Sequence, residues 1–198
     1  ATSQRFQLGM KAGFNISSTS LQDKGVEVGY LPGYQFGLSA MLGEQFYFQP
    51  ELLYIRKGMQ VDSMATADYY KFKNTYWEVP LMLNYGAGRE KVRIFLNFGP
   101  FISYWAHGRV TENIKGERTE YAYVFDDNLE DGFKDHRWDY GFNTGGGLGL
   151  KIRTGWLYIE GRYHYGFSDI RTVKEADVDY KPIRNRTISG TLSYLYQF

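Results

Sequence analysis

The sequence predicts an all-β protein, an eight-stranded antiparallel up-and-down transmembrane β-barrel. Segments of about ten residues alternate between apolar and polar side chains, as strands do when one face meets lipid. The connections between these segments are alternately long and short along the chain. There is also no uninterrupted apolar run of about 18 residues, so a membrane-spanning helix is not expected. Together these observations favour a barrel that crosses a bilayer with strands.

The composition agrees with many short strands and turns. Among 198 residues there are 23 glycines and 5 prolines, and 18% are aromatic. A formal net charge of +1 gives no electrostatic reason to expect nucleic acid as a partner. The lack of cysteine excludes disulfides, thiolate metal sites and cysteine nucleophiles. The first residues, ATSQRF, have neither the basic nor the apolar part of a signal peptide, so we expect any such peptide to have been removed.

Each expected strand shows a period of two. The eight segments are residues 6–15, 34–42, 46–57, 75–85, 92–104, 138–152, 156–167 and 187–198. The first has Phe6, Leu8 and Phe14 on one face and Gln7, Lys11 and Asn15 on the other. The last has the clearest apolar ribbon: Ile188, Gly190, Leu192, Tyr194, Tyr196 and Phe198. Successive strands can therefore present one apolar face to lipid.

The third segment, residues 46–57, is the least regular. Leu53 and Ile55 interrupt its alternation, and Pro50 cannot donate a hydrogen bond to a neighbouring strand. We therefore expect a bulge or local irregularity near Pro50.

The connections place the two ends of the barrel. The long polar ones are residues 16–33, 58–74, 105–137 and 168–186. In an up-and-down barrel all of these lie at one end, and the short turns and both termini lie at the other. Outer-membrane barrels have short periplasmic turns and longer outer loops. The predicted location is therefore the bacterial outer membrane.

If the apolar faces meet lipid, the charged residues on the opposite faces point into the barrel. The expected polar network of the lumen comprises Lys11, Glu51, Glu78, Arg93, Asp139, Lys151, Glu160, Arg162 and His164. Eight strands leave room inside for side chains only, and buried charges must pair. We expect this network to plug the lumen. A narrow proton or ion path through Glu78, Glu160 and His164 is an alternative that the sequence leaves open.

Aromatic residues cluster near the expected strand ends, where they would form belts at the two membrane interfaces. The interface aromatics predicted here are Trp77, Trp105, Trp138, Tyr196 and Phe198. Trp156 has the inward parity but lies at a turn, so its direction stays open.

Other motifs give weaker signals. His107 and His136 could bind zinc together with a loop carboxylate, and the acidic stretch 126–132 could bind calcium, but neither has the spacing of a dedicated site. The glycines of 145–149 lack the Lys-Ser/Thr ending of a phosphate-binding loop, and there is no Gly-x-Ser-x-Gly nucleophile motif. We expect no metal, no cofactor and no catalytic residue.

Several segments resemble one known family in their order and spacing. They are GMKAGFN at 9–15, QPELLYIRKG at 49–58, YWEVPLMLNYG at 76–86, FGPFISY at 98–104, DYGFNTGGGLGL at 139–150 and EGRYHYGFSDI at 160–170. They resemble the outer-membrane β-barrel family of Bacteroidota often labelled PorT-like. The resemblance covers nearly the whole chain and implies a single eight-stranded barrel domain over residues 1–198. It implies no particular function.

The predicted function is a non-enzymatic accessory or structural subunit with a plugged lumen. It would bind another envelope component through its outer loops or its barrel wall. Residues 105–137, the longest connection, are the strongest candidate contact surface. The expected partners are outer-membrane lipid, lipopolysaccharide and a larger outer-membrane protein complex, and not nucleic acid. A narrow channel, a small-ligand-binding barrel of lipocalin type and an outer-membrane enzyme are the alternatives.

Overall fold

The computed structural model describes residues 6–20, 26–43, 45–64, 66–89, 91–125, 133–169, 171–173 and 183–198. Over these ranges the chain forms the strands β1 (Phe6–Thr19), β2 (Val26–Gly43), β3 (Phe46–Ser63), β4 (Tyr69–Arg89), β5 (Val92–Ile114), β6 (Glu117–Ala122), β7 (Phe133–Asp135), β8 (Trp138–Ile152), β9 (Gly155–Gly166), β10 (Arg171–Val173) and β11 (Asn185–Gln197). These ranges contain no helix that is long and apolar enough to span a membrane.

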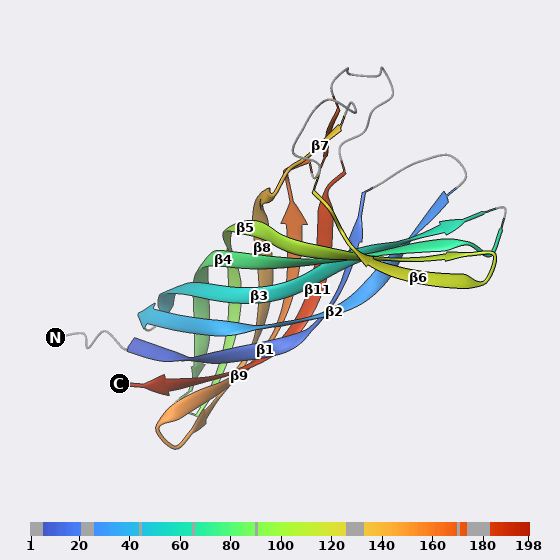
Figure 1. The fold of residues 1–198 in the computed structure, drawn as a ribbon. Coiled ribbons are helices and arrows are strands. Elements are labelled where there is room, and N and C mark those ends of the chain that lie inside the picture. The colour runs from blue at the N-terminus through green and yellow to red at the C-terminus, as the bar shows by residue number, and fades with distance from the viewer. Residues whose placement is uncertain are drawn as a thin grey trace.

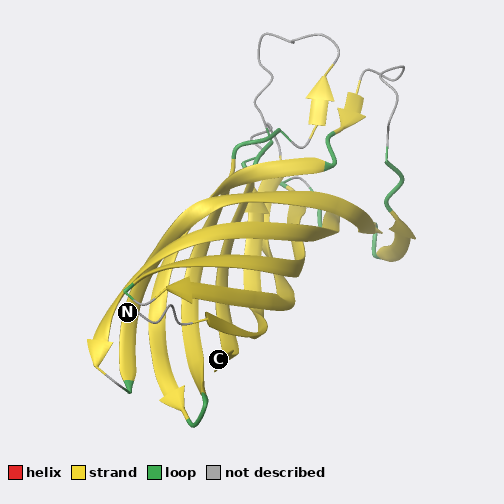
Figure 2. Ribbon diagram, turned by 90° about the vertical axis from the view of Figure 1, so that its left-hand side faces the viewer, coloured by secondary structure: helices red, strands yellow, loops and turns green. Residues whose placement is uncertain are grey.

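Within the described residues, eight of these strands close into an antiparallel barrel (Figure 2). Each of β1 to β4 pairs with the next strand along the chain, so that β4 pairs with β5. β5 then pairs with β8, β8 with β9, and β9 with β11. β11 then pairs with β1, from Gln197 opposite Gln7 to Asn185 opposite Thr19, so no strand edge is left open along the wall. Closure satisfies every backbone group that would otherwise face lipid. The predicted fold class is confirmed.

The alternation along each strand separates an outer apolar face from an inner polar one. In β1, Lys11 and Asn15 are buried, whereas Met10 and Phe14 are 73% and 80% exposed. The same contrast recurs around the barrel. It is the reverse of the pattern in a water-soluble protein, which buries apolar side chains and exposes polar ones. A soluble carrier of lipocalin type would need the opposite orientation, with its apolar face around a cavity.

Four strands are much longer than the alternation predicted. β2, β3, β4 and β5 continue through stretches that we expected to be polar connections, residues 16–33 and 58–74 and the start of 105–137. That expectation was wrong because these polar stretches pair with one another, as in Val28 with Val61 and Val61 with Tyr70. Outside the bilayer a sheet needs no apolar lipid face, so its strands carry no amphipathic signal.

The prolonged strands form a sheet that projects from the barrel, on the right in Figure 1. We call it the extension sheet: residues 26–30, 56–63, 69–75 and 107–114, together with β6. β6 joins β5 through Lys115 and Gly116, whose φ angles of 53° and 86° suit a tight two-residue hairpin turn. The acidic stretch 126–132, considered above for calcium, lies outside the described residues.

The bulge expected at Pro50 is absent. The pairing of β2 with β3 keeps one register across it, from Leu38 opposite Leu52 to Leu42 opposite Phe48. A proline removes an N–H group but adds no residue, so the register need not change. The register shifts lie elsewhere, between Tyr30 and Gln35 in β2 and at Thr75/Tyr76 in β4. Both mark the place where the barrel wall passes into the extension sheet, where a bulge can supply the extra twist.

Candidate functional site

The barrel interior is packed in layers, and β9 crosses them in order. Its inward side chains are Trp156 and Tyr158, then Glu160 and Arg162, then His164, and all of them are buried. The first pair belongs to an apolar layer, the second to a central ionic layer and the last to a second ionic group. The layers follow one another from the turn end of the barrel to the end that carries the extension sheet.

The apolar layer lies at the turn end. It consists of Met41, Tyr47, Phe95, Trp156, Tyr158 and Leu195. The guanidinium of Arg93 stacks on Trp156, 4.7 Å from the ring centroid, and lies 5.6 Å from that of Tyr47. Arg93 therefore points inward but contacts rings, and no ion pair joins it to the central charges in the described part of the chain. Trp156, whose direction the sequence left open, points inward and is 2% exposed.

Glycines on β8 make room for these rings. A Cβ atom on Gly149 would lie 2.6 Å from the Tyr158 ring, and one on Gly147 would lie 2.9 Å from the Phe95 ring. Both distances are too short for a real contact. These glycines therefore serve packing in a narrow barrel.

The central ionic layer joins three strands, β1, β3 and β9. Lys11 of β1 donates hydrogen bonds to Glu51 of β3, at 2.7 Å, and to Glu160 of β9, at 2.5 Å. Arg162 donates from Nη1 to Glu51 at 2.7 Å and from Nη2 to Glu160 at 2.5 Å. All four side chains are almost completely buried. Two cations thus bridge two carboxylates, and the formal charge of the layer is zero.

Neutral side chains complete the hydrogen bonding of these carboxylates. Asn97 donates to Glu160 at 2.6 Å, and Gln49 donates to Glu51 at 2.6 Å. A buried ion cluster is tolerable only when its remaining lone pairs are satisfied in this way. The structure therefore brings four of the nine predicted lumen residues into one compensated network.

A second ionic group lies next to this layer. Lys57 donates to Glu78 Oε2 at 2.5 Å, and its ammonium lies 4.9 Å from the Phe101 ring centroid. His164 Nδ1 is 3.2 Å from Glu78 Oε1, without the alignment of a hydrogen bond. Its Nε2 is 3.1 Å from Ser189 Oγ. Glu78 and His164 were candidates for a proton path. In the structure Glu78 is bound by Lys57, and His164 contacts Ser189.

Lys57 is a site residue that the sequence analysis missed. It was counted as the last residue of an irregular strand, because Leu53 and Ile55 appeared to break the alternation. In the structure Tyr47, Glu51, Leu53, Ile55 and Lys57 share one inward parity, and each is buried. The alternation that places Lys57 inside was therefore present in the odd-numbered positions. It was overlooked because two of the inward residues, Leu53 and Ile55, are apolar although the lumen is mostly polar.

The two remaining predicted lumen residues lie apart from both ionic groups. Asp139 is buried near the start of β8, where Ser168 and Asn185 donate hydrogen bonds to its carboxylate. Lys151 is exposed, so its assignment to the lumen was wrong. Its parity is inward, but it lies one residue from the end of β8, beyond the packed interior.

The end of the lumen nearest the extension sheet is closed by aromatic rings. Trp105 packs with Ile55 and Tyr76, and partly buried Tyr123 and Phe125 cover this cluster. Trp105 was predicted to lie at the membrane interface, and it is only 3% exposed. The prediction failed because the β5 backbone keeps Trp105 on the inward side next to a register shift, where its ring stacks 5.0 Å from Tyr123.

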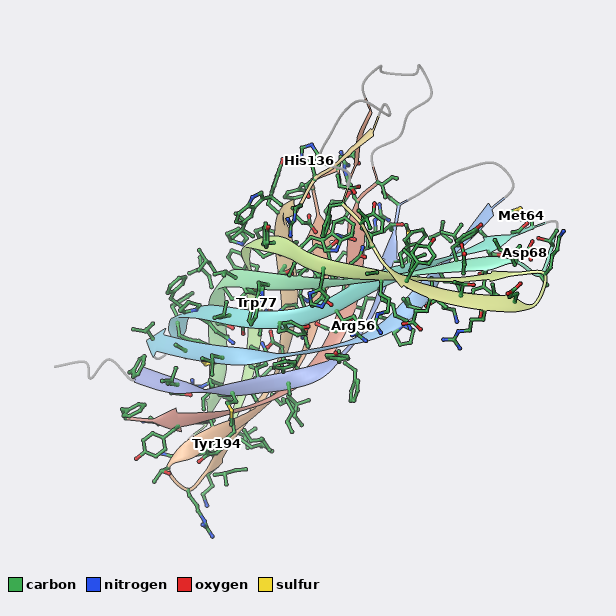
Figure 3. All side chains as sticks on the ribbon, viewed as in Figure 1. Arg56, Met64, Asp68, Trp77, His136 and Tyr194 are labelled. Atoms are coloured by element: carbon green, nitrogen blue, oxygen red, sulfur yellow. The ribbon has the colours of Figure 1, made fainter. Side chains whose placement is uncertain are left out.

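The other predicted interface aromatics are on the outside. Trp77 and Trp138 are 48% and 58% exposed, and Figure 3 labels Trp77 on the barrel wall. Trp77 follows Thr75, the last β4 residue of the extension sheet, by two positions. Tyr196 and Phe198 are exposed at the turn end, with ring centroids 4.9 Å apart. These positions suit two aromatic belts. In the described part of the chain, no three His, Asp or Glu side chains are grouped so as to hold a metal ion.

Comparison with known proteins agrees with this architecture. The family model described as "Outer membrane protein beta-barrel domain" matches residues 2–171. The chain belongs to this family. It is therefore a β-barrel protein of the bacterial outer membrane, which is the location that the sequence predicted. No curated protein matches the sequence.

Comparison with solved structures finds similarity at low sequence identity. OprG of Pseudomonas aeruginosa is 11% identical, with 98% of this chain and 95% of OprG covered and a TM-score of 0.51. Neisserial surface protein A is 16% identical, with 95% of each chain covered and a TM-score of 0.48. At this level of identity OprG supports the fold alone, and the similarity to the neisserial protein carries no further argument.

Proposed function

We propose that this outer-membrane barrel is a non-enzymatic, non-conducting accessory or structural subunit that binds another envelope component through its outer side. The resemblance to PorT-like barrels of Bacteroidota belongs to the same proposal. The observation that carries it is the contrast between a lumen packed with a charge-compensated network and a sheet that projects well beyond the membrane wall. Over the described residues the inner charges are paired with one another, which favours binding through the exterior.

The extension sheet has the features of such a surface. Short turns of outer-membrane barrels face the periplasm, so the sheet lies on the outer side. Within the described residues β6 pairs with β5 alone, and every residue of β6 is exposed. An unpaired strand edge is a ready template for a partner chain, whereas its charged residues discourage unspecific pairing.

Site-specific photo-crosslinking in intact cells tests this function. A photoreactive residue replaces Thr119 in β6, and the matched control replaces Lys151 at the turn end, which is also exposed. We expect a discrete adduct of defined mass from position 119 and none from position 151. Equal adducts from both positions, or none from any position in the extension sheet, would contradict the proposal.

Conductance separates this function from a narrow channel. The purified barrel in planar lipid bilayers should give flat current traces, because two ionic groups and two ring layers fill its lumen. Stepwise openings that change when Glu78 is replaced by Gln would instead support an ion path.

A further inference from the structure

A groove of about 540 Å³ lies on the outer face of the molecule, where the barrel wall passes into the extension sheet. Four cationic side chains line it: Arg56, Lys71, Lys73 and Arg118. Its opposite side is aromatic and includes Phe14 and Tyr34. Among the described residues that line it, none is acidic. The groove therefore joins a cationic surface to an aromatic one.

Its depth in the membrane follows from the strands that carry it. Phe14 and Tyr34 are neighbours across β1 and β2 on the lipid-facing wall. Arg56 follows Tyr54 by two residues on β3, a rise of about 7 Å along the strand. Tyr54 pairs with Trp77 in the outer aromatic belt, and belt aromatics sit at the level of lipid headgroups. Figure 3 shows Arg56 at the base of the extension sheet, so this cation of the groove lies at headgroup depth.

The cations retain capacity for a ligand. The Arg56 guanidinium stacks on Tyr34, 4.8 Å from the ring centroid, and its buried Nε has no hydrogen-bond acceptor among the described residues. The Lys71 ammonium lies 4.8 Å from the Tyr69 ring centroid. Stacked in this way, a guanidinium keeps its in-plane donors for an anion.

Two carboxylates of the extension sheet, Asp62 and Glu120, already have partners. Asp62, beside the groove, accepts a hydrogen bond from Gln60 at 2.8 Å. Glu120 pairs with Arg109 at 3.1 Å and reaches Arg118 only at 4.0 Å. Glu120 thus mainly neutralises Arg109, which does not line the groove, while Asp62 keeps its charge. The four lining cations still outnumber these two carboxylates.

We propose that this groove binds a phosphorylated glycolipid of the outer leaflet. Phosphate oxygens accept hydrogen bonds from Arg56, Lys73 and their neighbours, and the acyl chains continue down the wall over Phe14. Arginine is well suited to phosphate because its planar donors match two oxygens at once. The ligand is a lipid rather than a free anion because the groove opens directly onto the lipid-facing wall. This inference rests on the proposed function and names one component that the exterior binds.

The test measures binding of diphosphoryl lipid A to the purified full-length barrel by native mass spectrometry in detergent. The double variant Arg56→Gln/Lys73→Gln removes two charges from the groove. The matched control Lys91→Gln/Lys151→Gln removes two exposed charges at the turn end. We expect about tenfold weaker binding for the groove variant, as loss of charge-assisted hydrogen bonds predicts, and wild-type binding for the control. Heat-modifiable migration on gels verifies that both variants are folded.

Two further ligands decide whether the groove recognises phosphate on a lipid. Dephosphorylated lipid A should bind the wild type as weakly as the diphosphoryl form binds the groove variant. Inorganic phosphate at millimolar concentration should displace little lipid A. Equal binding to wild type and groove variant, equal binding of the dephosphorylated lipid, or full displacement by inorganic phosphate would each overturn the inference. If the crosslinks from Thr119 persist in such a case, the proposed function stands without it.

Discussion

At the scale of single residues, charge compensation decides what the lumen tolerates. Lys11 and Arg162 each bridge both Glu51 and Glu160, and all four side chains are nearly inaccessible to solvent. Taking charges out of water is costly, and only mutual pairing offsets the cost. Loss of one member therefore leaves an uncompensated charge, whereas loss of an opposite pair restores neutrality.

We expect Glu51→Gln to destabilise the barrel by about 3–5 kcal/mol, because it leaves an excess positive charge buried beside Lys11. The double variant Lys11→Met/Glu51→Gln should be destabilised by less than the sum of its single variants. The measurement is reversible urea unfolding in detergent micelles, followed by tryptophan fluorescence. Strict additivity in this double-mutant cycle would mean that the two side chains do not interact.

At the scale of elements, the extension sheet is held together at its far tip. The backbone N–H of Lys115, in the turn between β5 and β6, donates to Asp68 Oδ1 at 2.7 Å. The Thr66 hydroxyl donates to Asp68 Oδ2 at 2.8 Å. Figure 3 shows Asp68 and Met64 at this tip. One carboxylate therefore ties the connection between β3 and β4 to the next hairpin.

The stabilisation from the hydrogen bonds that Asp68 accepts should depend on pH. The Lys115 backbone N–H, and after it the Thr66 hydroxyl, holds the pKa of Asp68 below its usual value. Since the folded pKa is the lower one, the stabilisation is present at neutral pH and is lost as the pH falls through the folded pKa, below about 4. We expect protection of the Lys115 amide against hydrogen exchange to fall in that range, and to be low at every pH in Asp68→Ala.

The Tyr123 amide is the internal control for this experiment. It donates to the backbone carbonyl of Gly108 at 3.0 Å, and that acceptor does not titrate. Its protection should stay constant over the same pH range and in the variant. If Asp68→Ala kept the full protection of the Lys115 amide, the carboxylate would not be what holds the tip.

At the scale of the whole molecule, the position of each tryptophan reports which face meets lipid. Trp77 and Trp138 are about half exposed on the outer wall, whereas Trp105 and Trp156 are 3% and 2% exposed inside. The barrel thus contains two outward and two inward indole rings within the described residues. This division separates a membrane barrel from one whose apolar face surrounds a ligand.

Single-tryptophan variants, with the other three replaced by Phe, test the orientation in bilayers that contain brominated lipid. We expect strong fluorescence quenching for Trp77 and Trp138 and little for Trp105 and Trp156, because bromine quenches on close approach. Quenching of Trp105 as strong as that of Trp77 would show that its ring reaches the interface after all.

Much of the barrel could be predicted because its signal is local. The face of a strand residue follows from its parity, so Lys11, Glu160 and Arg162 could be assigned to the interior before their partners were known. Parity failed where a strand ends. Lys151 has inward parity but lies past the packed layers. Trp105 follows its inward parity and was misplaced because it was assigned to the interface from its position near the strand end. The extension sheet was missed for a different reason, since its strands pair in water and carry no apolar period.

The sequence by itself therefore determined the fold class, the strand order and the division into lipid-facing and inner residues, because a period of two and the lengths of connections can be read along the chain. Only the tertiary structure decided which inner charges meet. Glu51 and Arg162 are 111 positions apart in sequence, and Lys11 and Glu160 are 149 positions apart. Their contact depends on how the strands are staggered and tilted around the closed barrel, which no local pattern encodes. For the same reason only the structure brought Arg56, Lys73 and Tyr34 around one groove.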